Sequence, residues 1–401
     1  MSHAGRYSFL ISFISFIPMH VLEIPSFFPP YGGLFCLDQA KALAALGHEV
    51  RILSNVQLGM TIGLKDYLTL PFSRYEHDMD GIRVFQSYQR GIPKCVRYNV
   101  RRWVGIVQSM FADYIRKYGQ PDILHAHCGK WAGYAAMQIS HQHHIPYVIT
   151  EHLSKQLFRD EFGDDLSNVW QIPLLKEAYR QASMVVPVSE ELVDSLASYF
   201  GTDYRWQPLS NVIDVDFYHY QKRMPLEGRP FRFCCLASFW PLKGYDVLIP
   251  AFRQLRESGV VAELHIAGRG TDSADCLSML SEGIVSHGLL DKEAVRSLLY
   301  QSDALVLASR SEVQPLVLLE AMSTGIPVVA TECIPQSLRI EQGCTIVPVD
   351  DVKALSEAMR KVSQCDSFDG QTVSGKVRQM AAPEIIGQKL VAMFSGILAS
   401  D

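Results

Sequence analysis

Two glutamates in the segment 309–331 could together bind a ligand that carries hydroxyl groups and a phosphate. Glu312 follows the apolar run 304–307, which predicts a buried parallel strand, and Glu320 lies in the apolar run 317–322, which predicts a buried helix. In open α/β sheets, ligands bind beyond the carboxyl ends of strands and against helix starts. Both carboxylates could therefore face one crevice, where they would accept hydrogen bonds from hydroxyl groups while helix-start amides hold the anion.

The same spacing has an ordinary explanation. A solvated glutamate at a helix start and a second glutamate in a salt bridge would produce it, and such pairs occur by chance in a chain of 401 residues. The flanks support the predicted elements, because Pro315 suits the first turn of the helix and Gly325 suits its end. Only the wider pattern around the two glutamates separates a site from chance.

That wider pattern, Ser-x-x-Glu-x7-Glu-Ala-Met-x-x-Gly-x-Pro-Val-Val-Ala, resembles the nucleotide-sugar site of retaining glycosyltransferases of family 4, which have the GT-B fold. The resemblance implies that Glu312 contacts the donor sugar and that Glu320 contacts the ribose hydroxyls. The family usually has Gly-Phe-Gly after the first glutamate, whereas this chain has Val-Gln-Pro. Because proline has no amide hydrogen, the amides of the neighbouring residues become the candidate donors. The donor-binding residues implied in this segment are Gln314, Pro315, Leu316 and Val317.

Lys243 and Gly244 open a second predicted helix, where a lysine beside helix-start amides would bind an anion. An exposed surface lysine is the alternative explanation. The segment resembles the Gly-Arg-Leu-x3-Lys-Gly motif of the same family, but the family's arginine falls on Ser238. Arg269 could replace that missing cation. Gly268, just before it, matches a family Gly-x-Gly loop that lies near the base or the phosphates.

Gly32 and Gly33 lie in the loop between the first predicted strand and helix, where glycine lets a ligand approach the backbone closely. A plain tight turn would explain them equally well, and Gly-x-Gly-x-x-Gly is absent. By resemblance, this loop faces the donor phosphates and the acceptor. Pro-Asp-x-x-His-x-His followed by Thr-Glu-His also resembles the family, and it implies that His152 reaches the donor sugar. A buried histidine bonded to backbone is the alternative for His152.

Histidine-rich stretches invite a metal interpretation, which we do not favour. His125 and His127 share one face of a predicted strand and 141–144 adds further histidines, but no carboxylate or cysteine completes the group at a familiar spacing. Asp214 and Asp216 form an Asp-x-Asp pair in linker context. We therefore expect no metal and no cofactor other than the nucleotide-sugar substrate.

A basic stretch mixed with aromatic residues runs from residue 90 to residue 103. It could bind an anionic lipid surface or a lipid-diphosphate acceptor, or it could be a solvated helical face. With a net charge of −5, the chain has no global basic field that would favour nucleic acid. The residues of this stretch are Arg90, Lys94, Arg97, Tyr98, Arg101, Arg102 and Trp103.

Compartment signals are limited to the cysteines and the amino-terminal residues. Nine cysteines without a Cys-x-x-Cys spacing favour reduced cytosolic thiols, and the protein could lie at the inner face of the plasma membrane. Arg6 precedes the apolar run 7–17, which looks like the start of a signal peptide. We favour a start that is assigned too early, with translation beginning at Met19.

The chain as a whole predicts two doubly wound Rossmann-like α/β domains that face each other across a cleft. We expect an amino-terminal extension at 1–18, an acceptor-side domain at 19–215, a nucleotide-sugar domain at 216–382 and a returning helix at 383–401. The resemblance implies metal-independent, retaining transfer to a glycan or lipid-linked acceptor, with Lys243, Glu312 and His152 in the catalytic site. A sugar-nucleotide epimerase or phosphorylase, and a non-catalytic nucleotide-sugar-binding protein, are the alternatives.

Overall fold

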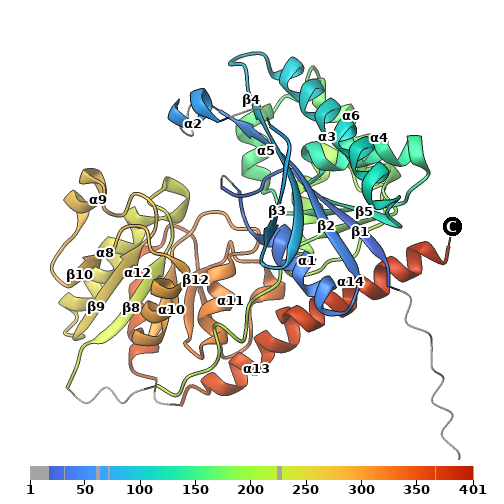
Figure 1. The fold of residues 1–401 in the computed structure, drawn as a ribbon. Helices are drawn as coiled ribbons and strands as arrows, with labels where there is room; N and C mark the ends of the chain where they lie inside the picture. Colours follow the sequence, from blue (N-terminus) through green and yellow to red (C-terminus); the bar gives the residue numbers. More distant parts are fainter. Residues whose placement is uncertain are drawn as a thin grey trace, which may run out of the picture.

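The computed structural model describes residues 18–400, apart from 31, 60–63, 71–72, 224–227 and 366. The signal-like run 7–17 lies outside the described residues, as does the middle of the linker at 224–227. Figure 1 shows two α/β domains side by side, each built on one sheet. The predicted fold class is therefore confirmed.

The first domain holds a seven-stranded sheet among the described residues, in the order β3-β4-β2-β1-β5-β6-β7. Every neighbouring pair is parallel except β3 with β4. Strands β1 to β4 form one half of the sheet and strands β5 to β7 form the other half. The switch point therefore lies between β1 and β5, and the loops after these two strands flank it. The strands are β1 (His20–Pro25), β2 (Glu49–Leu58), β3 (Tyr75–Met79), β4 (Ile82–Arg90), β5 (Ile123–His127), β6 (Tyr147–Glu151) and β7 (Met184–Pro187).

Helices cover both faces of this sheet. Successive strand residues point to opposite faces and are buried in two separate apolar cores. Val21 packs into one core and Leu22 into the other. The helices are α1 (Phe35–Ala45), α2 (Leu64–Thr69), α3 (Val96–Tyr118), the π-helix η1 (Gly129–Gly133), α4 (Tyr134–His143), α5 (Lys155–Phe162), α6 (Gln171–Gln181) and α7 (Glu191–Phe200).

The second domain holds a parallel six-stranded sheet in the order β10-β9-β8-β11-β12-β13, within the part of the chain that is described. Its switch point lies between β8 and β11. Adjacent cysteines in β8 show the alternation of faces in a strand, since Cys234 and Cys235 are buried in different cores. The strands are β8 (Phe231–Leu236), β9 (Ala262–Ala267), β10 (Ile284–Ser286), β11 (Ala304–Leu307), β12 (Val328–Thr331) and β13 (Cys344–Val347).

The helices of the second half follow β8 along the chain. They are η2 (Pro241–Lys243), α8 (Tyr245–Glu257), α9 (Ala274–Met279), α10 (Lys292–Gln301), α11 (Leu316–Ser323), η3 (Gln336–Leu338), α12 (Val352–Ser363), α13 (Gly370–Ala381) and α14 (Pro383–Leu398). None of the helices in the described ranges combines the length and the apolar character that a bilayer crossing requires.

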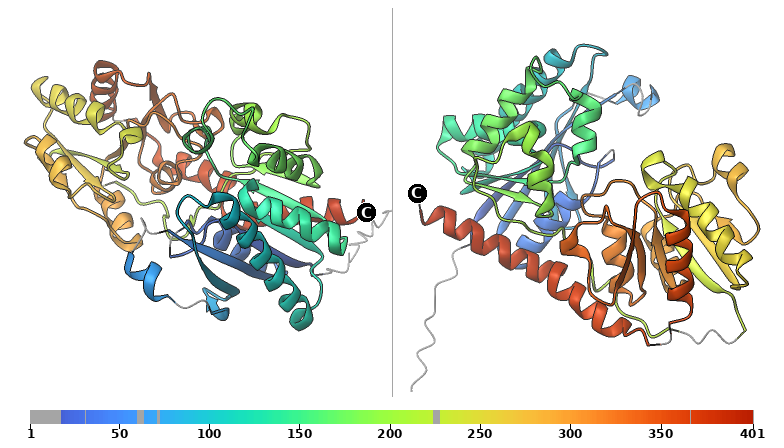
Figure 2. Two further views of the ribbon diagram at one scale, coloured as in Figure 1. Left: turned by 90° about the horizontal axis from the view of Figure 1, so that it is seen from above. Right: turned by 180° about the vertical axis from the view of Figure 1, so that it is seen from behind.

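Helix α14 crosses from the second domain back onto the first, as predicted. Ile386, Leu390 and Phe394 are buried in the core that also contains α1. The two helices approach closely, because a Cβ on Gly387 would lie 2.8 Å from the carbonyl oxygen of Ala42. Figure 2 shows α13 and α14 running one after the other beneath the second and the first domain, so together they tie the domains to each other.

The stretch 363–374 is polar in composition, which predicts a loop, but this prediction is wrong because α13 begins within the stretch at Gly370. Asp369 caps the helix by accepting a hydrogen bond from the amide of Thr372 at 3.0 Å. Val373, Val377 and Ala381 then form a buried stripe at helical spacing. Polar residues separate these three in the sequence, so the composition of the segment does not indicate the stripe.

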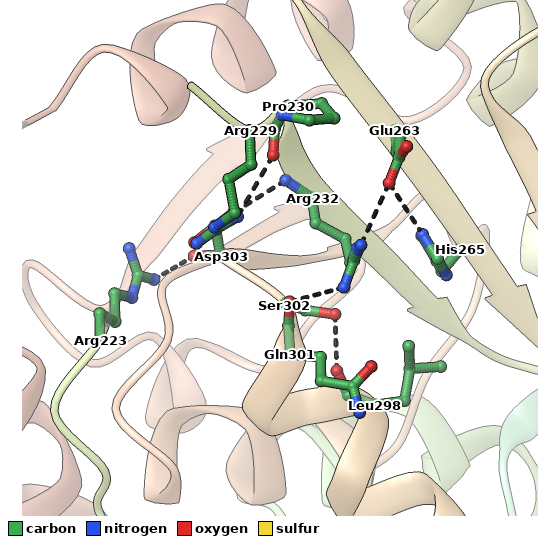
Figure 3. Close-up of polar contacts among 10 residues, drawn as sticks. All are labelled: Arg223, Arg229, Pro230, Arg232, Glu263, His265, Leu298, Gln301, Ser302 and Asp303. Carbon is green, nitrogen blue, oxygen red and sulfur yellow. Dashed lines mark hydrogen bonds and ion pairs between the residues drawn. The ribbon is translucent and has the colours of Figure 1, made fainter. Parts of the chain in front are cut away.

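A buried carboxylate anchors the end of the interdomain linker to the second sheet (Figure 3). Asp303 accepts two hydrogen bonds from Arg229, at 2.7 and 2.8 Å, and one from the amide of Arg232 at 2.8 Å. Arg223 donates to the carbonyl oxygen of Asp303. Asp303 precedes β11 and Arg232 lies at the start of β8, so the cluster holds the edge of the sheet opposite the switch-point loops.

Candidate active site

Lys243 and Glu312 meet at the switch point of the second sheet, since Lys243 follows β8 and Glu312 follows β11. Lys243 Nζ lies 2.6 Å from Glu312 Oε1, and the hydroxyl of Ser309 donates to the same oxygen at 2.7 Å. Gly244 permits the approach of the two loops. Its φ is +66°, and a Cβ there would lie 2.0 Å from the carbonyl oxygen of Ala308.

A pocket of about 360 Å³ opens between the two domains at this ion pair. The first domain contributes Phe35, His152 and Asn211 to its lining. The structure thus brings His152 to the same pocket as Lys243 and Glu312. The other predicted donor-binding residues in the lining are Ser238, Gln314 and Leu316.

Glu320 lies in an adjacent pocket, not in the same crevice as Glu312. That pocket also contains Gly32, Gly33 and Asp38 from the first domain and Lys292 from the second. Phe35 and Leu316 line both pockets, so the two cavities are contiguous at these residues. Glu320 lies about one turn into α11, which begins at Leu316, so the two glutamates line different pockets.

Two carboxyl groups that line the second pocket have raised pKa values, and a third has a lowered one. Burial raises the pKa of Glu320 to about 7, although Lys292 opposes the shift. Burial also raises the pKa of Asp38 to about 6. Asp214 is held by Lys292 at 2.9 Å, which lowers its pKa against the effect of burial. The pocket therefore offers carboxyl groups that hydroxyls of a ligand can bind.

The glycine loop brings an aromatic side chain onto His152. A Cβ on Gly33 would lie 2.2 Å from the ring of Phe35, so a larger residue would displace that ring. The Phe35 ring stacks on the imidazole of His152, with the ring centroids 4.2 Å apart. Gly32 is equally confined, since a Cβ there would lie 2.4 Å from the amide nitrogen of Phe28.

Several predicted donor-binding residues lie outside the lining of both pockets. Arg269 is exposed in the loop after β9, so the expectation that it replaces the missing arginine at Ser238 is not supported by its position. Gly268 packs against the exit of β8, where a Cβ would lie 2.2 Å from the carbonyl oxygen of Ala237. Pro315 is the N-cap of α11, not part of its first turn, and Val317 packs against the core of the second domain.

Gln314 acts through its side chain, whereas the sequence suggested only its amide. Gln314 Oε1 accepts a hydrogen bond from the amide of Asn211 at 2.9 Å, and Gln314 Nε2 donates to the hydroxyl of Ser210. These bonds join the start of α11 to the segment between the domains. The side-chain oxygen of Asn211, which lines the pocket, is buried and has no hydrogen-bond partner among the described residues.

Glu151 fixes the backbone around His152 at the end of β6. Its Oε1 accepts hydrogen bonds from the amides of His152 and Leu153, at 2.9 and 2.8 Å. Its Oε2 accepts from the amide of Gly129 at 2.9 Å. Burial raises the pKa of Glu151, while these bonds favour its ionised form.

A carboxylate lies beside the paired histidines, at no familiar sequence spacing. Glu23 of β1 lies against His125 and His127 of β5, and one ligand atom from each of these residues falls within 4.8 Å of the others. The Asp-x-Asp pair, by contrast, is divided between two partners, because Asp214 contacts Lys292 and Asp216 contacts Arg378. The sequence carried a signal for the buried carboxylate, namely a lone charged residue in the apolar run 19–25.

Sequence reasoning missed several pocket residues. Phe35 and Trp240 are ordinary apolar residues in the sequence, and nothing in the spacing distinguishes them from core residues. Asp38 and Lys292 come from helices 250 residues apart and meet only because the domains face each other.

Comparisons with known proteins identify the chain. The family described as Glycosyltransferase Family 4 matches residues 32–217, and the family described as Glycosyl transferases group 1 matches residues 230–364. A Salmonella typhimurium protein described as a colanic acid biosynthesis glycosyltransferase, WcaL, is 23% identical over 92% of this chain and 97% of its own. A Mycobacterium tuberculosis glycogen synthase is 24% identical over 90% of this chain and 94% of its own.

Solved structures share the fold. The sucrose-phosphate synthase of Thermosynechococcus elongatus has a TM-score of 0.76 and 17% identity, covering 95% of this chain and 100% of its own. Anabaena HepE in complex with UDP and glucose has a TM-score of 0.68 and 16% identity, covering 94% and 99%. Together with the family matches over both domains, these relations show that the chain is a glycosyltransferase of the family 4 type with the GT-B fold.

Proposed function

We propose that this glycosyltransferase moves a sugar from a nucleotide diphosphate sugar to a glycan or lipid-linked acceptor, with retention of the anomeric configuration. The observation that carries the proposal is the interdomain pocket, where Lys243, Glu312 and His152 face one another. A cation, a carboxylate and an imidazole around one cavity suit a ligand with a phosphate leaving group and a hydroxylated ring.

Stabilisation of the departing diphosphate falls to Lys243 and the first amides of α8. The four leading N–H groups of a helix have no partner within the helix, and they attract an anion. As the bond from the sugar to phosphate loosens, negative charge grows on the leaving oxygen, and preorganised donors of this kind stabilise it. This cationic site makes a metal ion unnecessary in the proposed reaction.

The nucleoside part of the donor would occupy the adjacent pocket. Ribose hydroxyls would donate hydrogen bonds to Glu320, in the role that the family resemblance assigned to it. Because Leu316 and Phe35 line both pockets, one elongated ligand can reach from Glu320 to Lys243. The glycine loop at 32–33 borders the same space and leaves room for the phosphates between the two pockets.

In the proposed reaction, Glu312 and His152 orient the sugar and form no bond to it. The sugar becomes oxocarbenium-like, and the acceptor hydroxyl attacks from the face that the phosphate leaves. The departing phosphate oxygen takes the proton of the acceptor, so no separate general base is needed. The two-carboxylate arrangement of glycosidases does not fit here, since Glu312 is paired with Lys243 and Glu320 lies in the next pocket.

A role in surface-polysaccharide assembly is consistent with the names of relatives in colanic acid and teichuronic acid biosynthesis. As a contact for a membrane or an acceptor, the basic stretch at 90–103 must be defined without its two end residues. Arg90 donates to the carbonyl oxygens of Leu68 and Leu70, and Trp103 is buried, with its indole N–H donating to Asn55. These two end residues serve the fold of the domain.

A smaller exposed surface near α2 is the proposed contact with a lipid headgroup layer or a lipid-linked acceptor. Cationic and apolar side chains alternate on it, which suits the interface of an anionic bilayer. We call this set the basic-apolar surface, and it consists of Leu64, Leu68, Ile92, Lys94, Val96, Arg97, Tyr98 and Arg101.

The test of the proposed function is a two-stage assay. Calorimetry with a panel of nucleoside diphosphates would identify the base, and turnover of the matching nucleotide sugars would then be followed with and without glycan and lipid-linked acceptors. Transfer that depends on an acceptor supports the proposal. Free sugar or epimerised donor without an acceptor would favour an epimerase or phosphorylase, and tight binding without turnover would favour a binding protein.

A further inference from the structure

Behind His152, the first domain buries a group of ionisable side chains that the proposed reaction does not use. Glu23 of β1 is in register with His125 of β5, because the two strands are parallel neighbours. His127 follows two residues later and faces the same side of the sheet. Glu23, His125 and His127 are 0, 0 and 1% exposed, so water cannot solvate them.

These side chains form a continuous chain of contacts that ends at the pocket. Oε2 of Glu23 lies 2.7 Å from Nε2 of His127. The other ring nitrogen of His127, Nδ1, lies 3.2 Å from Nε2 of His152, and the two rings stack at 12°. His125 forms a branch, with Nδ1 2.9 Å from the same carboxylate oxygen and Nε2 2.7 Å from the hydroxyl of Thr150.

The donors and acceptors along this series of contacts fix the direction of each hydrogen bond. Burial would raise the pKa of Glu23, but His125 and His127 lower it to about 2, so its carboxylate is ionised and only accepts hydrogen bonds. His127 must then carry its proton on Nε2. Burial lowers the pKa of both His127 and His152, which keeps both rings neutral. A neutral His127 has a lone pair at Nδ1, and the proton between the rings belongs to Nε2 of His152.

One ring nitrogen is left over at the end of the chain. Nδ1 of His152 is buried and has no hydrogen-bond partner among the described residues. A buried polar atom without a partner costs about 1–3 kcal/mol, which a ligand hydroxyl could offset. His152 lines the pocket that also contains Lys243 and Glu312, so a bound sugar is the nearest source of such a hydroxyl.

We propose that Glu23 and His127 are positioning residues for the transfer reaction: they hold His152 in the tautomer that carries its proton on Nε2 and offers the lone pair of Nδ1 to a hydroxyl of the donor sugar. The identity of that ligand rests on the proposed function, whereas the tautomer follows from the contacts alone. The effect on transfer is orientation of the sugar, because the ring can accept one hydrogen bond in one direction.

The direct test uses the full-length wild-type protein and needs no substrate. Nitrogen-15 NMR of histidine-labelled protein reports which ring nitrogen carries the proton, and His152→Asn identifies the signals of His152. We expect a neutral ring with the proton on Nε2. A proton on Nδ1, or an imidazolium at neutral pH, would overturn the proposal, as would one equivalent of tightly bound metal at Glu23, His125 and His127 by mass spectrometry.

Substitutions at His127 separate positioning from packing. In His127→Asn, the amide oxygen can take the place of Nδ1 and accept from His152, while His127→Leu has a similar volume and no acceptor. We expect His127→Leu to lower kcat about tenfold or more and His127→Asn to retain most of it, with KM changed less than kcat. Equal losses in the two variants, at equal free energies of unfolding, would indicate a purely structural role.

A double-mutant cycle separates positioning from packing even if His127→Leu folds less well than wild type. If His127 acts through His152, His127→Leu has no further effect on kcat once His152→Asn is present. Additive losses would contradict the relay. Should wild type turn over no nucleotide sugar at all, the proposed function fails, and the tautomer measured by NMR still decides whether the relay exists.

Discussion

Lys243 Nζ and Glu312 Oε1 are 2.6 Å apart, and this ion pair joins the two loops that flank the switch point of the second sheet. Each partner is mostly removed from solvent, with 29 and 9% of the side chain exposed. A donor that inserts its phosphate beside Lys243 and its sugar beside Glu312 would take over both partners. In the proposed function, the pair would keep the site organised until such a ligand binds.

Glu312→Gln should lower kcat about a hundredfold while changing nucleotide affinity little, because the lost charge would face the sugar in the transition state and not the base. Steady-state turnover with the natural donor measures this. Ser309→Ala is the matched control, since it removes only the 2.7 Å hydrogen bond to Glu312. It should cost less than about tenfold, and a Glu312→Gln enzyme with full turnover would remove Glu312 from the site.

Nucleotide affinity should rise with pH up to about 7 and then level off, because burial raises the pKa of Glu320 to about 7. The ionised carboxylate accepts both ribose hydrogen bonds, whereas the protonated form must use one oxygen as a donor. Asp38 faces the same pocket, and because burial raises its pKa to about 6, its titration contributes a separate rise at lower pH. Calorimetry from pH 5.5 to 8.5 should show no rise near pH 7 for Glu320→Gln, and an unchanged rise in that variant would assign the pH dependence to Asp38.

Asp303→Ala should lower the free energy of unfolding by about 3 kcal/mol, because it leaves Arg229 and the amide of Arg232 without their shared partner. Urea denaturation measures this change. Glu263→Ala is the control, since it removes only partly exposed contacts, with Arg232 at 3.3 Å and His265 at 3.4 Å, and should cost less than about 1 kcal/mol. Nucleotide affinity should stay the same in both variants, and equal losses of stability would contradict the anchoring role of Asp303.

Leu64→Ser with Leu68→Ser should weaken binding to vesicles of anionic lipid, because these leucines are 58 and 62% exposed on the basic-apolar surface. Sedimentation with vesicles of phosphatidylglycerol and phosphatidylcholine measures the bound fraction. Leu289→Ser in the second domain is the matched control, since Leu289 is 71% exposed outside that surface. Equal binding of wild type and both variants would show that the surface makes no contact with lipid.

The architecture could be predicted from the sequence because its signals are local. Apolar runs of four to six residues separated by helical patterns indicate parallel strands with crossovers, and Lys243 and Glu312 could be placed at strand ends from the same patterns. The returning helix 383–398 also has a continuous apolar pattern. Helix α13 was missed because its buried stripe is spread among polar residues.

The rest of the site depends on contacts between distant segments. Glu23 meets His127 across 104 residues, and Phe35 reaches His152 only because Gly33 leaves space for its ring. Arg269 was expected in the site because its residue type suits phosphate; it lies exposed outside the lining of both pockets, and its role stays a prediction. Residue types and spacing indicate what a segment can do, whereas register and domain orientation decide what it meets.

The most direct test of the account is calorimetric binding of a nucleoside diphosphate to wild type, to Lys243→Met and to Lys243→Met with Glu312→Gln. The double variant removes the repulsion that an unpaired Glu312 would add. We predict that both variants bind the diphosphate about tenfold or more weakly and bind the parent nucleoside as wild type does. Unchanged affinity for the diphosphate in the double variant would contradict the claim that Lys243 holds the leaving group.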